Sequence, residues 1–449
     1  MTDGRPSLIA TVPPLAAPRR ARKLTSAERT LDSGLRVVAV RKPGVPLVEL
    51  RLRIPFLSTR VAHAARSALL SDTVLTGTAH RDRTSLAAAV QALGGDFGAA
   101  VDADRLMISG NVMAANLGPL LDLLADVLTA ASYPAAEVDA ERHRLVEKLT
   151  IARSRAGVVA GEALAQRMYR DHPYAWDLPQ VPDVAAVTRV QLKALHGQRV
   201  RPDGAVLIVV GDLSPAQAVD VAEAALGPWS GAPARSRAPQ LPPLEPGPLL
   251  LVDRPGSVQS TVRLGGRALP RDDPQYPPLQ LANLVFGGYF SSRWNENIRE
   301  DKGYTYGPHS RIEHNVLGSA LILDADVATE VTAPAFLETV YELGKIASLP
   351  ITQDELTSVR QYAIGSLALS VATQAGLAST LASLAGTGLS VDWLAEHPRR
   401  LEQVPRDDVT AAAAKFFAPA QLVGVVVGDA SRVAEPLAAL TPVISQPSG

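Results

Sequence analysis

The sequence contains no cysteine among its 449 residues, which excludes disulfide bonds, thiolate metal sites and a cysteine nucleophile. Aromatic residues are also scarce, at 4% against 47% apolar residues, so the cores must be built from Ala, Leu and Val. Neither sign of charge is in excess, because 44 Lys and Arg residues stand against 45 Asp and Glu residues. This balance predicts that neither a nucleic acid nor an anionic membrane is a partner.

Long apolar runs are missing as well. No run approaches the ~20 residues that a membrane-spanning helix needs. The N-terminal stretch lacks the basic start and the apolar segment of a secretory signal. We therefore expect a cytoplasmic protein, and the Ala-, Arg- and Pro-rich usage favours a bacterial one.

The strongest organising pattern is an internal repeat. Residues 35–56 form two alternating strands around a Pro-Gly turn, an entry hairpin, and residues 249–266 repeat that layout. Residues 205–227 form a buried strand, a Gly-Asp turn and an amphipathic helix, and residues 422–440 repeat these. The two pairs lie at nearly the same offset. The sequence thus predicts an α+β fold of two homologous units, each a mostly antiparallel sheet with helices on one face.

The repeat also predicts the domain boundaries. The stretch between the two units is rich in Pro and Gly, which cannot hold a helix or a central strand, so it is a linker. The predicted segments are an N-terminal arm at 1–23, a first unit at 24–230, the Pro-rich linker at 231–248, a second unit at 249–444 and a tail at 445–449.

A search for catalytic chemistry finds little. No two of the eight histidines lie four apart on a helix, the spacing that puts two imidazoles on one face for zinc. His309 and His314 are five apart on a predicted strand, where they face opposite sides. A Gly-x-Ser-x-Gly nucleophile elbow and a phosphate-binding P-loop are both absent. The motifs alone therefore name no enzyme.

One polar cluster, within residues 281–310, is more informative. It predicts a helix, a turn, a second polar helix that breaks at Gly303, and then a Tyr-Thr-Tyr strand. The break allows Arg299 and Tyr306, seven residues apart, to reach a common point. An arginine fork and a phenol together can hold a carbonyl or a carboxylate. The alternative is that Arg299 pairs with a local acid such as Glu300 and Tyr306 packs on the sheet.

At this point the sequence resembles the pitrilysin/insulinase-type zinc peptidases, whose metal site is a His-x-x-Glu-His helix. The resemblance covers about residues 24–440. Its pieces come in family order: LDSGLRVVAVRKPG, the helix ending in TGT-x-x-R, ALGGDFGA, YPAAEVDAERHRLVEKLTIARSRAG, DHPYAW, RPDGAVLIVVGDLSP and FGGYFSSRWNENIREDKGYTYG. It implies that the two units form one half of a clamshell that encloses a peptide together with a second half.

Laid on this family, the metal site is degenerate. The helix at 65–80 places Ala68 at the first histidine, Ser71 at the general base and Asp72 at the second histidine. The distal glutamate ligand falls on Lys148. The neighbouring Glu147 would supply at most a second ligand under a shifted alignment, and the acid seven residues before Lys148 is retained as Glu141. This comparison implies that the chain itself holds no metal and no cofactor.

The second-half cluster matches the family well. Arg299 and Tyr306 stand where family members carry the Arg and Tyr that bind the substrate backbone and stabilise the oxyanion in the partner half. Tyr304 is a weaker candidate for the tyrosine. Only Gly287 and Gly288 stand where mitochondrial presequence-processing alpha subunits have a long Gly-rich loop, so presequence specificity does not carry over.

The resemblance therefore implies a non-catalytic, substrate-binding subunit of a heterodimeric zinc metalloendopeptidase. Its partner would bear His-x-x-Glu-His and the zinc, and its substrate would be a peptide. The alternative is a catalytically inactive homodimer of the same fold that binds peptides or acts as a scaffold. An active peptidase with an unprecedented site is a third, weaker reading.

Overall fold

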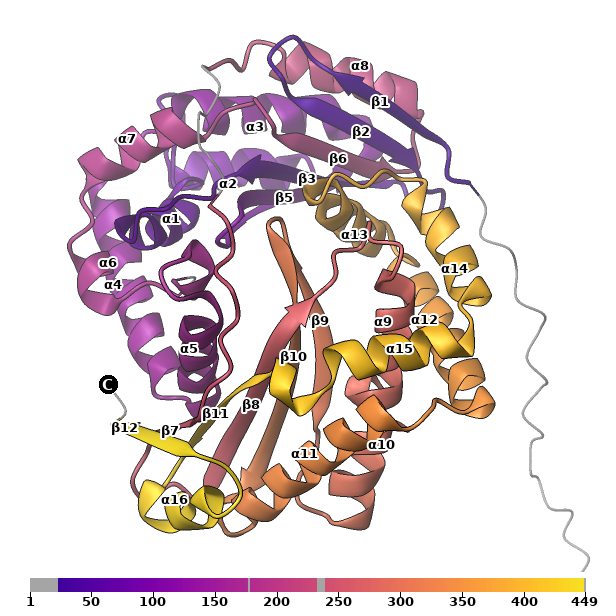
Figure 1. The fold of residues 1–449 in the computed structure, drawn as a ribbon. Helices are drawn as coiled ribbons and strands as arrows, with labels where there is room; N and C mark the ends of the chain where they lie inside the picture. The colour runs from indigo at the N-terminus through magenta and orange to yellow at the C-terminus, as the bar shows by residue number, and fades with distance from the viewer. Residues whose placement is uncertain (1–22, 177, 232–238, 448–449) are drawn as a thin grey trace, which may run out of the picture.

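The structure is a computed structural model that describes residues 23–176, 178–231 and 239–447. Two six-stranded sheets form its frame (Figure 1). The first sheet contains β1 (Ser26–Thr30), β2 (Arg36–Arg41), β3 (Leu47–Pro55), β4 (Asp96–Val101), β5 (Arg105–Met113) and β6 (Val206–Gly211). The second contains β7 (Leu249–Asp253), β8 (Gln259–Ala268), β9 (His309–Asn315), β10 (Gly318–Ala328), β11 (Val423–Gly428) and β12 (Val443–Pro447).

Helices fill the sequence between the strands of each sheet. Those of the first unit are α1 (Ala62–Thr73), α2 (Arg83–Ala92), α3 (Leu117–Ala130), α4 (Ala135–Arg153), α5 (Ala156–Tyr169), α6 (Val181–Ala185), α7 (Arg189–Arg199) and α8 (Pro215–Leu226). Those of the second are α9 (Tyr276–Asn283), α10 (Arg293–Asn295), α11 (Thr332–Ser348), α12 (Gln353–Ser370), α13 (Gln374–Gly386), α14 (Trp393–Gln403), α15 (Arg406–Phe416) and α16 (Ala430–Ala438).

The predicted α+β fold of two homologous units is confirmed. The strand orders, β1-β2-β6-β3-β5-β4 and β12-β7-β11-β8-β10-β9, correspond position by position, and both sheets are mixed. They differ only at the outer edge. There β1 pairs antiparallel with β2, whereas β12 pairs parallel with β7.

The entry hairpin predicted at 35–56 does not form as a directly paired hairpin. Strand β6 lies between β2 and β3, parallel to β2 and antiparallel to β3. Its sequence VLIVVG is buried at every position. Because such a strand is apolar on both faces, it needs a central place in a sheet that is covered on both sides. In the second unit β11 separates β7 from β8 for the same reason.

Each sheet is covered on one face by helices of its own unit and on the other by a helix of the other unit (Figure 1). Val38 and Ile208 of the first sheet pack against Leu377 and Leu381 of α13. On the second sheet, Ile322 and other apolar strand residues pack against α5. The two units thereby exchange helices, and their relative position is fixed by buried apolar contacts.

Only some of the predicted domain boundaries can be compared with the structure. Nearly all of the arm at 1–23 and the linker residues 232–238 lie outside the described residues, and residues 239–248 contain no helix or strand. The predicted junction between 444 and 445 falls inside β12, which hydrogen-bonds to β7. The second unit therefore extends into the predicted tail, because the exposed edge of β7 takes up the chain that follows α16.

Within the described part of the chain, no single helix is long and apolar enough to cross a membrane. One pair, α12 with α13, meets that criterion jointly by length and composition, with a bend of 109° between the two helices.

Candidate functional site

A cavity of about 350 Å³ lies beside α1 and brings the degenerate metal positions together. Ala68, Ser71 and Asp72 line it from α1, and Lys148 lines it from α4. Strand β4 and the segment after α5 complete the wall. The four positions that the family comparison singled out thus share one cavity.

Local sequence explains how α1 presents these side chains. Leu69 and Leu70 are fully buried in the core of the first unit, which turns Ala68 and Asp72, four residues apart, toward the cavity. The helix ends at Thr73, whose hydroxyl donates to the carbonyl of Leu69 at 2.5 Å. The chain then reverses at Gly77, where φ is +150° and a side chain would be strained.

The cavity contains the opposite charges of Asp72 and Lys148, which do not form an ion pair. Burial raises the pKa of the Asp72 carboxyl, the positive charge of Lys148 opposes this shift, and the negative charge of Glu141 adds to it. Among the described residues Lys148 and Asp72 form no ion pair within 4.0 Å. The two side chains therefore sense each other's charge without direct contact.

Neither of the two nearby glutamates offers a free ligand. Glu141 is buried, and its carboxylate accepts from Arg83 at 2.9 Å and also contacts Arg144. Glu147 is exposed and does not line the cavity. A shifted alignment with Glu147 as the ligand therefore gains no support from the geometry.

The residues present do not fit a zinc ion. A zinc site in a protein needs three or four nitrogen, sulfur or oxygen ligands. At the four family positions the cavity offers one carboxylate at Asp72, a methyl group at Ala68, a neutral hydroxyl at Ser71 and a cation at Lys148. His63 and Asp102 also line the cavity, but the Nε2 of His63 is already engaged by the carbonyl of Phe56. Across the described ranges of the chain, no group of three or more Asp, Glu and His side chains is placed to hold a metal ion.

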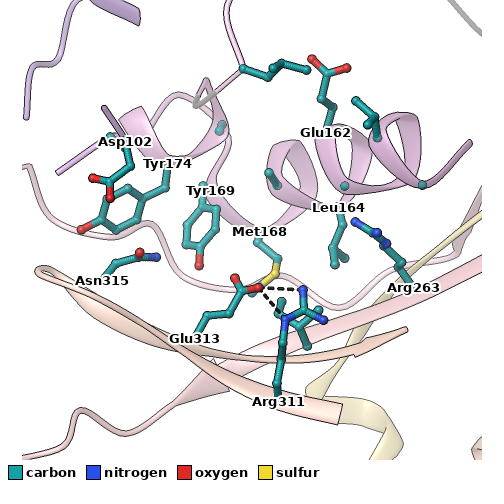
Figure 2. Close-up of a pocket in the computed structure, with 18 of the residues that line it drawn as sticks. Asp102, Glu162, Leu164, Met168, Tyr169, Tyr174, Arg263, Arg311, Glu313 and Asn315 are labelled. Atoms are coloured by element: carbon teal, nitrogen blue, oxygen red, sulfur yellow. Dashed lines mark hydrogen bonds and ion pairs between the residues drawn. The ribbon is translucent and has the colours of Figure 1, made fainter. Parts of the chain in front are cut away.

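A second cavity, of about 570 Å³, adjoins the first and lies between α5 and the second sheet (Figure 2). The two share Asp102, Ala103 and Leu178 in their linings. Figure 2 shows aromatic and apolar side chains on one wall and Arg311 paired with Glu313 on the other. This cavity carries both signs of charge and an apolar surface, which suits a peptide better than a small ion.

Arg299 and Tyr306 are brought together as the sequence predicted. The guanidinium of Arg299 lies 5.0 Å from the ring centre of Tyr306. Its Nε also lies 3.2 Å from a carboxylate oxygen of Glu300, an exposed pair of small energetic value. Tyr306 is 88% exposed. The local ion pair thus exists, but Tyr306 does not pack on the sheet.

Two features of this segment differ from the prediction. Residues 304–306 form no regular strand; only Thr305 bridges Val327, and β9 begins at His309. The helical turns at Leu284–Gly288 and Glu296–Asp301 are π-helical, which a periodicity of 3.6 residues does not reveal.

The structure also separates the two tyrosines. Tyr304 is partly buried against the core of the second unit, whereas Tyr306 faces solvent beside Arg299. The geometry therefore favours Tyr306 over Tyr304 as the partner of the arginine.

Phe290 is a residue that sequence reasoning missed. Its ring centre lies 4.4 Å from the Arg299 guanidinium, on which it stacks together with Tyr306. The Phe290 side chain is 60% exposed, and it stacks on an Arg299 side chain that is itself 25% exposed. Phe290 follows Tyr289 after the π-helical segment Leu284–Gly288, and nothing in the sequence marks it as a partner of Arg299.

Comparison with known proteins places both sites in one family. Residues 66–179 match the family model described as insulinase (peptidase family M16), and residues 186–362 match the model described as peptidase M16 inactive domain. A protein of Mycobacterium tuberculosis named as an uncharacterized zinc protease is 26% identical over 413 residues, covering 88% of this chain and 90% of that protein. A Bacillus subtilis protein named as a probable inactive metalloprotease is 29% identical over 230 residues, covering 46% of this chain and 51% of that protein.

Solved structures share the fold over most of the chain. A crystal structure from Pseudomonas fluorescens, described as a peptidase M16 inactive domain, has a TM-score of 0.83 at 24% identity and covers 90% of this chain and 98% of its own. A protease from Helicobacter pylori has a TM-score of 0.82 at 17% identity, covering 91% of this chain and 100% of its own. From the two family matches and this shared fold, the chain belongs to the M16 (insulinase/pitrilysin) family of peptidases.

Proposed function

We propose that the chain is the non-catalytic, substrate-binding subunit of a heterodimeric zinc metalloendopeptidase. Its two units form one half of a clamshell, and a partner subunit with His-x-x-Glu-His supplies the other half and the zinc. The chain contributes Arg299 and Tyr306 to the partner's active site. The enzyme acts on peptides enclosed between the halves, in the cytoplasm.

The observation that carries this proposal is the contrast between the two candidate sites. The α1 cavity holds Ala68 and Lys148 where ligands are needed, whereas Arg299 and Tyr306 stand 5.0 Å apart on an exposed surface. Among the described residues no group of three or more Asp, Glu and His side chains is placed to hold the zinc that such a pair would assist. The exposed Tyr306 and the partly exposed Arg299 beside it are accessible to groups on another subunit.

The chemistry of the pair suits peptide cleavage. The Arg299 fork can donate two parallel hydrogen bonds to a carbonyl or carboxylate oxygen of the substrate. The Tyr306 hydroxyl can donate to the negative charge that develops on the carbonyl oxygen when the peptide bond is attacked. A guanidinium carries only donors and a phenol can donate its O–H, so both side chains suit an oxygen acceptor.

The runner-up function is a catalytically inactive homodimer that binds peptides or acts as a scaffold. The similarity to the Bacillus subtilis protein named as a probable inactive metalloprotease is the observation that favours it. In that case the adjoining cavities beside α1 and α5 bind peptide, but no bond is cleaved.

Co-expression separates the two functions. The chain is produced alone, with a His-x-x-Glu-His relative from the same genome, and the relative is also produced alone; each preparation is assayed on an unstructured peptide. We expect co-purification and cleavage by the mixture only. A chain that purifies as a homodimer, does not bind the relative and adds nothing to its activity contradicts the heterodimer and supports the inactive homodimer.

A further inference from the structure

A third cavity, of about 220 Å³, lies at the start of α1 and is lined by cationic and neutral groups alone. Arg60 and Arg66 line it from α1 and the loop before it, and Arg199 lines it from the end of α7. The remaining wall is formed by Ser58, Thr59, His63, Leu195 and Gln198. None of these lining residues is acidic.

The three arginines have no carboxylate to balance them among the described residues, where the ion pairs involve other arginines. All three line this one cavity, and burial followed by the positive charge of Arg60 lowers the pKa of Arg199. Like charges held together in a partly buried cavity are unfavourable without a counter-ion. The cavity therefore has an excess of positive charge that a bound anion would neutralise.

His63 adds a neutral group to this wall. Its pKa is lowered to about 4, first by burial and then by the positive charges of Arg199 and Arg66. Its Nε2 lies 2.7 Å from the carbonyl oxygen of Phe56 and is therefore the protonated nitrogen at neutral pH. The positive charge of the cavity at neutral pH thus comes from the arginines.

The ends of two helices add partial charges near the cavity, but they do not determine the sign of its net charge. The N-terminal turn of α1 has no side-chain cap, and the N–H groups of His63 and Ala64 donate to the carbonyls of Arg60 and Val61, so this helix end contributes chiefly the positive end of its dipole. The C-terminal end of α7 brings an opposing partial charge near Arg199. Because each helix end amounts to about half a charge, the two offset each other and the three full arginine charges remain.

We propose that this cavity is a binding site for a phosphate group. A phosphate dianion offers oxygens to more than one guanidinium fork at once, which matches three converging arginines. A single carboxylate has two oxygens and one charge, and would leave two of the three arginines unbalanced. The hydroxyl of Ser58 and the amide of Gln198 line the same cavity as neutral donors.

The size of the cavity limits the ligand. At about 220 Å³ it is smaller than the ~300–1,000 Å³ of ordinary small-molecule sites. It takes inorganic phosphate or the phosphoryl end of a small ester. The cavity adjoins the α1 cavity, with which it shares Ser58, Arg60 and His63 in its lining. The site does not depend on the proposed peptidase role.

Titration calorimetry of the full chain with inorganic phosphate tests this site in a low-salt buffer near pH 7.5. We expect saturable binding at one site per chain. Removing one arginine removes charged hydrogen bonds, so Arg60→Ala and Arg199→Gln should each weaken binding by about 10–100-fold. Lys193→Ala, which deletes an exposed cation on α7 outside the cavity, should leave binding unchanged.

Two further arms identify the ligand. Glycerol phosphate in place of inorganic phosphate distinguishes an ester from the free ion, and tighter binding of either supports the site. Acetate should not bind. Absence of saturable phosphate binding, unchanged binding in folded Arg60→Ala and Arg199→Gln, or acetate binding as tight as phosphate would each overturn the proposal. Because Arg60 is exposed, its alanine variant should keep the fold, which circular dichroism checks.

Discussion

The α1 cavity and the Arg299–Tyr306 pair differ in whether the side chains that the family uses for chemistry are present. At α1 the helix, its buried leucines and the surrounding walls are in place, but the side chains at the ligand positions cannot bind zinc. At the pair, both side chains are present and adjacent, with Tyr306 exposed and Arg299 partly buried. The difference shows that a family fold persists because of its apolar core, whereas chemistry depends on a few side chains that the core does not require.

The largest expected effect is on zinc binding, when the missing metal ligands are restored in the α1 cavity. The combined variant Ala68→His, Asp72→His and Lys148→Glu places two imidazoles four apart on α1 and a carboxylate on α4, three ligands of the kind zinc takes. We expect it to retain one zinc ion per chain after dialysis, measured by atomic emission, whereas the unaltered chain retains none.

The variant with Ala68→His and Asp72→His but with Lys148 unchanged is its control, and should bind zinc far more weakly because a cation stands at the third ligand position. If the folded triple variant holds no more zinc than this control, the three altered positions do not converge as the cavity indicates.

The next largest effect concerns the tyrosine of the pair. In the active complex, Tyr306→Phe removes one hydrogen-bond donor to the oxyanion and should lower kcat about 10²–10³-fold with little change in KM. Tyr341→Phe, which alters another exposed tyrosine on α11, should leave both constants unchanged. Equal kinetics for the two variants would remove Tyr306 from the reaction.

A smaller effect is expected at Phe290, which stacks on Arg299 at 4.4 Å. A cation–π contact at an exposed site is worth about 0.5–1 kcal/mol. Phe290→Ala should therefore reduce turnover of the complex about 2–5-fold, and Phe290→Tyr should restore it. Failure of the tyrosine variant to restore turnover would show that Phe290 acts other than by stacking.

The smallest effect is a dependence of stability on pH at Asp72. Although the Asp72 side chain is exposed, the walls of the cavity partly desolvate its carboxyl and raise its pKa in the folded state, so its ionised form costs a little stability near pH 7. That penalty is absent below the unfolded pKa of about 3.8 and develops as the pH rises through the folded value. Asp72→Asn should thus stabilise the chain in urea unfolding near pH 7.

The gain from Asp72→Asn should shrink toward pH 4, and Lys148 is exposed enough to tolerate the loss of its neighbour's charge. A gain in stability that is the same at both pH values would show that the amide acts by packing or hydrogen bonding rather than by removing a partly desolvated charge.

Much of the fold could be predicted from the sequence, because alternation, turn residues and the repeat are local signals. The repeated strand VLIVVG at 206–211 and VGVVVG at 423–428 identified the two units. Sequence did not reveal that these strands insert between their neighbours, or that α5 and α13 cross to the other unit's sheet. Those features depend on long-range packing, which leaves no period in the chain.

The candidate sites divide in the same way. The spacing of Arg299 and Tyr306 around Gly303 was enough to predict that they meet, and the family order was enough to locate Ala68 and Lys148. The sequence did not predict the cavity proposed for phosphate, because Arg60 and Arg199 are far apart in the chain and come together only through the packing of α1 on α7. The role of Phe290 was not predicted either, because stacking on a cation has no sequence motif.

The most direct test of the account is the peptidase activity of the complex when its arginine is removed. This chain, as Arg299→Ala or as Lys302→Ala, is assembled with a His-x-x-Glu-His partner, and cleavage of an unstructured peptide is measured at equal complex concentration. Lys302→Ala removes a charge from the same turn and should leave turnover intact. We predict that Arg299→Ala lowers turnover about 10²–10³-fold without preventing assembly; unchanged turnover in a properly assembled complex would contradict a divided active site.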